Sequence, residues 1–107
     1  MNNKEEILPI GTVCILKDVK KKIMIIGHLA RLYKFKNKVY DYMGCLYPEG
    51  FFSSDKNMLF NKEDIEKVLY KGYIDDEQQK LFAEIERIKS NLDNNKRENT
   101  WLYKFYY

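Results

Sequence analysis

The sequence predicts a small α+β protein, in which a bent antiparallel β-sheet or an SH3-like partial barrel is followed by a C-terminal amphipathic helix. Short apolar, β-branched runs separated by polar turns fill the first half of the chain, and a helical period of apolar residues begins near residue 75. The chain has 107 residues, a length typical of one domain. We therefore expect a small β domain over residues 1–74 and a helix with an aromatic tail over 75–107, packed together as a single domain.

Three runs in the first half are expected to form the strands of a meander. The first covers Thr12–Leu16, the second runs from Ile23 to Tyr33, and the third covers Val39–Met43. The first two runs are continuously apolar, which indicates that both of their faces are covered. The third run alternates in polarity, which predicts that Asp41 faces water.

The middle of the chain is expected to hold a turn, a short strand and a last strand. Tyr47–Gly50 contains Pro and Gly at positions that suit a turn, and Met58–Phe60 is a strand candidate. Asn61 is a good N-cap for one helical turn, in which the negative charge of Asp64 meets the N-terminus favourably. We expect the last strand over Glu66–Gly72.

The C-terminal part begins with an amphipathic helix of roughly 16 to 18 residues. Asp75 or Asp76 is expected to cap it, and Asn94 is expected to lie at its end. A helix of this length is marginal alone in water, so its apolar stripe must dock on the sheet or on another molecule. The stripe consists of residues at spacings of four, three and four: Leu81, Ile85, Ile88 and Leu92.

Composition and charge are those of an ordinary globular protein. Apolar residues make up 45% of the chain, charged residues 33%, and the net charge is +3. The longest strongly apolar run, Ile23–Ile26, is too short to span a membrane, and the N-terminus lacks the hydrophobic core of a signal peptide. We therefore expect a cytoplasmic protein without a membrane span.

The charge is concentrated in one segment. Lys17–Lys38 contains eight basic residues and one acidic residue, a net charge of +7. Lysines at turns and strand ends protect sheet edges from pairing with other chains and need no ligand. Two other roles stay open: contact with an acidic protein partner, and binding of nucleic acid with Tyr33 and Phe35 as stacking groups.

The sequence offers little for catalysis. His28 is the only histidine, and no nucleophile turn surrounds Cys14 or Cys45, which we expect to be buried and reduced. The glycines form no phosphate-binding or dinucleotide-binding pattern, and the cysteines lack metal-ligand spacing. We expect a protein that is not an enzyme and that has no cofactor and no metal.

The aromatic side chains are the best candidates for partner contacts. Water-exposed aromatic residues forfeit a few kcal/mol of burial energy, so we expect them to be covered, either by this chain or by a partner. The loop after the third strand would form an apolar rim against which an amphipathic helix could lie. The expected anchors are Tyr47, Phe51, Phe52, Trp101 and Phe105.

Four blocks of the chain resemble one family of small proteins of unknown function from Gram-positive bacteria. The blocks occur in the same order and cover residues 7 to 74. They are Ile7–Val13, Ile23–Gly27, Tyr40–Gly44 with Tyr47–Gly50, and Phe60-Asn61 with Asp64-Ile65 and Gly72-Tyr73.

Members of this family are commonly encoded beside type VII secretion genes and their LXG-domain toxins. The resemblance implies an accessory role, as a cytoplasmic chaperone or targeting factor for a helical LXG toxin domain, without enzymatic activity. It assigns no catalytic residue. Two other hypotheses stay open: a nucleic-acid-binding module that uses Lys17–Lys38, and a self-associating structural protein, such as a homodimer formed through the helix stripe.

Overall fold

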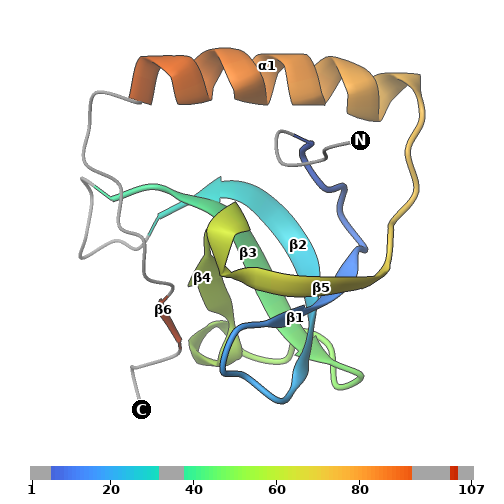
Figure 1. Ribbon diagram of the computed structural model, residues 1–107, viewed down its shortest axis with the longest axis vertical. Helices are drawn as coiled ribbons and strands as arrows, with labels where there is room; N and C mark the ends of the chain where they lie inside the picture. Colours follow the sequence, from blue (N-terminus) through green and yellow to red (C-terminus); the bar gives the residue numbers. More distant parts are fainter. Residues whose placement is uncertain (1–5, 32–37, 93–101, 104–107) are drawn as a thin grey trace.

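A computed structural model describes residues 6–31, 38–92 and 102–103 of the chain, the last two by their backbone (Figure 1). All strands join in one open antiparallel sheet in the order β5-β1-β2-β3-β4-β6. One long helix lies between β5 and β6 in the sequence. This arrangement confirms the predicted α+β class. The strands are β1 (Val13–Leu16), β2 (Lys22–Ala30), β3 (Tyr40–Tyr47), β4 (Met58–Phe60), β5 (Ile65–Tyr70) and β6 (Leu102–Tyr103), and the helix is α1 (Asp76–Leu92).

The meander of β1, β2 and β3 forms as predicted, but β3 continues to Tyr47 rather than ending at Met43, and β2 is shorter than expected. This strand ends at Ala30 rather than at Tyr33, and Leu29 just before its end adopts a left-handed conformation with φ of 50°. Such a conformation is unfavourable for a branched residue and turns the chain out of the regular strand direction. The register between β2 and β3 also shifts between Ile25 and Gly27, which marks a bulge.

The core is built mainly from side chains of β1, β2, β3 and β4. Side chains with almost no exposed surface come from each of the four strands, and Gly44 on β3 gives them room. A Cβ at Gly44 would overlap the side chain of Ile23 and come within 3.1 Å of the Met24 carbonyl oxygen. The buried set includes Cys14, Leu16, Ile23, Ile25, Met58 and Phe60.

A capped turn leads from β4 into β5, as the sequence predicts. The backbone N–H of Asn61 donates to Oδ2 of Asp64 at 2.8 Å, and a short 3-10 helix, η3 (Lys62–Asp64), follows. The chain then runs beside β1 as β5, which covers Ile65–Tyr70 rather than the expected Glu66–Gly72. The strand ends because the chain passes closely over the Ile10–Gly11 backbone, where a Cβ at Gly72 would collide with the Ile10 carbonyl oxygen.

Helix α1 begins at the predicted cap and spans 17 residues. Oδ1 of Asp75 accepts the backbone N–H of Gln78 at 3.0 Å, so Asp75 is the capping residue. Ile85 is buried and Phe82 half-buried, whereas Leu81 and Ile88 are exposed. The predicted apolar stripe is therefore only partly used for docking on the rest of the chain.

The start of the described chain lies between α1 and the sheet (Figure 1). Ile7 and Leu8 are buried there, and the backbone of Leu8 is held on both sides. Its N–H donates to the hydroxyl of Tyr42 at 3.0 Å, and its carbonyl oxygen lies 2.8 Å from Nε2 of His28. Phe82 of α1 then contacts the His28 ring edge-on.

Asp41 does not face water, and this prediction was wrong. Oδ2 of Asp41 accepts the backbone N–H of Lys62 at 2.8 Å, and Oδ1 lies 3.1 Å from Nζ of Lys89 on α1. The Asp41 N–H donates to Oδ1 of Asn61 at 3.0 Å. The carboxylate is thus buried because residues from two distant segments satisfy it, and the ion pair joins α1 to the sheet.

Candidate functional site

The last residue of β3 and the loop between β3 and the 3-10 helix η2 (Ser54–Lys56) carry three of the predicted anchors. We call Tyr47–Phe52 the aromatic loop. Its turn is closed by Gly50, whose N–H donates to the Leu46 carbonyl at 2.7 Å and whose φ is +81°, a conformation that favours glycine. This turn leaves Tyr47 40%, Phe51 57% and Phe52 60% exposed.

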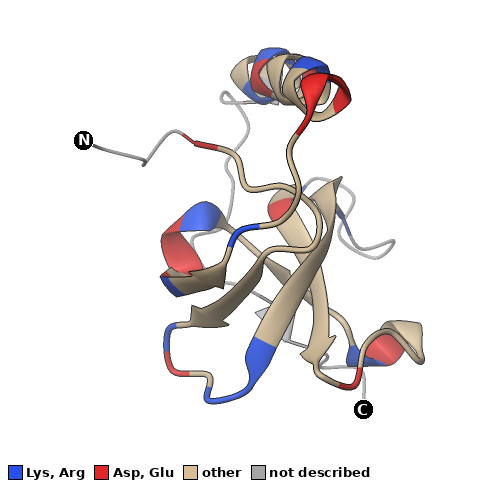
Figure 2. Ribbon diagram, turned by 90° about the vertical axis from the view of Figure 1, so that its right-hand side faces the viewer, with Lys and Arg blue, Asp and Glu red and all other residues tan. Residues whose placement is uncertain are grey.

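A lysine-rich turn lies beside the aromatic loop. We call Lys17–Lys22, between β1 and β2, the basic turn. Nζ of Lys21 lies 2.9 Å from the Glu49 carboxylate, and Lys22 is paired with Tyr47 in the β2–β3 register. The hydrogen bond from Lys21 lowers the pKa of the Glu49 carboxyl below its usual value. Both turns lie at the end of the sheet opposite α1 (Figure 2).

The predicted anchors Trp101 and Phe105 lie outside the described residues. The structure therefore places three of the five expected anchors, and it places these three on one loop. Their exposure leaves the aromatic rings available for contact with another molecule.

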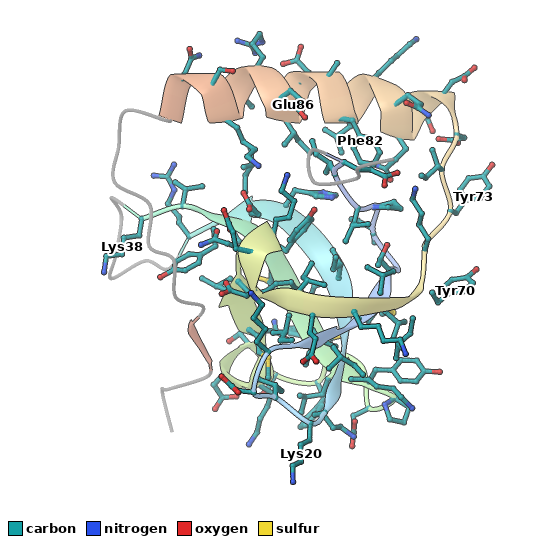
Figure 3. All side chains as sticks on the ribbon, in the orientation of Figure 1. Lys20, Lys38, Tyr70, Tyr73, Phe82 and Glu86 are labelled. Atoms are coloured by element: carbon teal, nitrogen blue, oxygen red, sulfur yellow. The ribbon has the colours of Figure 1, made fainter. Side chains whose placement is uncertain are left out.

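A second exposed apolar surface was not predicted from the sequence. It lies on the edge strand β5 and the segment after it, where the side chains of Tyr70 and Tyr73 are 65% and 77% exposed and point away from the body of the protein (Figure 3). Only the position of β5 at the edge of the sheet reveals that its apolar side chains are exposed. We call Ile10, Val68, Leu69, Tyr70 and Tyr73 the β5 surface.

A groove of about 390 Å³ runs along β5. Leu8, Ile65 and Val68 supply its apolar lining, and an ion pair between Glu6 and Lys71 joins its two walls. This groove lies along the edge strand and includes no residue of the aromatic loop.

The cysteine and histidine side chains are buried or make contacts that hold the fold together. Burial raises the pKa of the Cys14 thiol to about 12 and also raises that of Cys45, which makes both weak nucleophiles at neutral pH. Both cysteines are free and buried, as predicted. His28 holds the Leu8 backbone, and burial raises the pKa of the capping residue Asp64.

Two further properties concern metals and membranes. Within residues 6–31 and 38–92, no cluster of three or more His, Cys, Asp and Glu side chains forms a potential metal site. No helix in the described part of the chain combines the length and apolar character that a membrane crossing requires.

The basic segment does not form a single patch. Lys20 lies on the basic turn at one end of the molecule, whereas Lys38 lies at the start of the chain leading into β3, well away from it (Figure 3). Residues 32–37, with the expected stacking groups Tyr33 and Phe35, are outside the described residues. Within the described part of this segment, Lys22 of the basic turn is paired with an exposed aromatic residue, Tyr47.

Comparisons with known proteins identify the family and nothing closer. A search of curated proteins and a search of solved structures each found no match. The model of one family, described as domain of unknown function DUF4176, matches residues 7–81, which include every strand from β1 to β5 and the first turns of α1. The chain therefore belongs to the DUF4176 family.

Proposed function

We propose that this protein is a non-enzymatic binding protein that holds a helical polypeptide through its aromatic loop. The observation that carries the proposal is the exposure of Phe51 and Phe52, 57% and 60%, on a loop whose turn is fixed by hydrogen bonding. Aromatic side chains presented on a fixed loop contribute strongly to protein interfaces because little conformational freedom is lost when they are covered.

The resemblance described above supports a finer proposal for the partner. The partner is an LXG-domain toxin of the type VII secretion system, and the protein acts as its cytoplasmic chaperone or targeting factor. The amphipathic helices of such a toxin domain need their apolar faces covered until they pack or are exported. Contact with Phe51 and Phe52, with Tyr47 at the edge, supplies part of that cover.

Co-expression with an LXG toxin domain tests the proposal. We expect a complex that elutes as one species in gel filtration. The double variant Phe51→Ala/Phe52→Ala should lose the complex while keeping its own fold, because both side chains are more than half exposed.

The matched control is Tyr70→Ala/Tyr73→Ala, which removes two aromatic rings that are even more exposed, from the β5 surface. This variant should bind like the unsubstituted protein. Separate elution of the two unsubstituted proteins would contradict the proposal. Loss of the complex only in the control would move the binding site to β5.

A further inference from the structure

The aromatic loop and the basic turn form one continuous surface. Lys22 and Tyr47 are opposite each other in neighbouring antiparallel strands, so their side chains leave the sheet on the same face. The ion pair between Lys21 and Glu49 then joins the two turns beyond the ends of the strands. A polypeptide that covers Tyr47 therefore lies within reach of the basic turn.

The charges of this surface are unbalanced. Lys21 is paired with Glu49, but Lys20 and Lys22 are exposed and make no ion pair with another described residue, whereas Lys17 lies next to Asp64. Asp18 is the acidic residue of the same turn, and its φ of 64° is set by the tight reversal of the chain. Lys22 thus presents an unpaired ammonium group beside Tyr47, and Lys20 adds a second one on the same turn.

We infer that the helix held by the aromatic loop carries acidic side chains along one border of its apolar stripe, and that Lys20 and Lys22 receive these carboxylates. This inference rests on the function proposed above, because it specifies the partner of the same surface. Apolar contact with Phe51 and Phe52 supplies affinity, and the lysines fix which way the helix lies. A helix with lysines along that border would bring like charges together and bind less tightly.

Two synthetic peptides provide the direct test. Each is an amphipathic helix of about 18 residues with the same leucine stripe, bordered in one peptide by glutamates and in the other by lysines. Binding of each labelled peptide to the full-length protein is measured by fluorescence anisotropy at about 50 mM and about 500 mM salt. We expect the glutamate-bordered peptide to bind about tenfold more tightly at low salt, and the difference to shrink at high salt.

Charge reversal at the surface should reverse the preference. Lys22→Glu should weaken binding of the glutamate-bordered peptide by about fivefold and strengthen binding of the lysine-bordered one. Lys80→Glu, which makes the same charge change at an exposed position on α1, should alter neither affinity. Lys20→Glu changes a residue that lies outside β2, so it leaves the strand pairing intact. It should shift the two affinities in the same directions as Lys22→Glu.

The outcomes separate the inference from the proposed function. Equal binding of both peptides, abolished by Phe51→Ala/Phe52→Ala, would overturn the inference and leave the proposed function standing. Failure of both peptides to bind would overturn both. Tighter binding of polyuridine than of the glutamate-bordered peptide would assign the basic turn to nucleic acid and would also overturn the inference.

Discussion

The ion pair between Asp41 and Lys89 gives a test of how α1 is held on the sheet. The side chain of Asp41 is 4% exposed and that of Lys89 is 21% exposed. The substitution Lys89→Met keeps a side chain of similar length and removes the charge. It leaves the buried Asp41 carboxylate with the Lys62 N–H as a remaining hydrogen-bond donor.

The cost follows from these exposures. Removing one partner of a fully buried ion pair costs about 3–5 kcal/mol, because the other charge stays buried without compensation. Water reaches Lys89, and the Lys62 N–H continues to donate to Asp41, so we expect Lys89→Met to lower the free energy of unfolding by about 2 kcal/mol. The double variant Asp41→Asn/Lys89→Met should cost less than the sum of the two single changes.

Urea unfolding followed by far-ultraviolet circular dichroism measures these differences. The control is Arg87→Met, which breaks the exposed pair between Arg87 and Glu84 on the outer side of the same helix and should cost less than about 0.5 kcal/mol. A change for Lys89→Met as small as that of the control would refute the conclusion that the pair fixes α1 on the sheet.

Three other predictions concern the core. Gly44→Ala should destabilise the protein by about 1–3 kcal/mol, because the new methyl group overlaps the fully buried Ile23; an unchanged urea midpoint would contradict this packing. Phe60→Ala should lower the free energy of unfolding by about 3–5 kcal/mol, whereas Phe51→Ala should lower it by about 1 kcal/mol or less. Similar losses for both variants would show that the aromatic loop belongs to the core. At pH 8, a thiol reagent should label Cys14 about a thousandfold more slowly in the native protein than in urea, and equal rates would place that thiol at the surface.

Local sequence signals predicted the meander, the capped turn and α1. The runs of β1 and β2 are rich in β-branched residues and too short for a helix, which indicates strands. Asn61 and Asp64 cap their turn through a hydrogen bond between residues only three positions apart. The period of α1 and the capping oxygen of Asp75 are also local properties. The exposure of Phe51 and Phe52 follows from a turn that Gly50 makes possible, so the loop itself was predictable.

Long-range contacts explain what the sequence did not reveal. The burial of Asp41 depends on Lys89, which lies on another element far along the chain, and alternation within one strand carries no information about it. The apolar side chains Val68 and Leu69 are exposed because β5 pairs with β1 at the edge of the sheet. Likewise, the ion pair between Lys21 and Glu49 could be recognised only after β2 and β3 were aligned.

The central claim is that this protein holds a helical polypeptide against the aromatic loop and the basic turn. Amide hydrogen exchange of the complex with its co-expressed partner measures the contact directly. We expect new protection over residues 17–22 and 47–56 and unchanged exchange over residues 65–73. Protection of residues 65–73 without protection of the aromatic loop would contradict the claim.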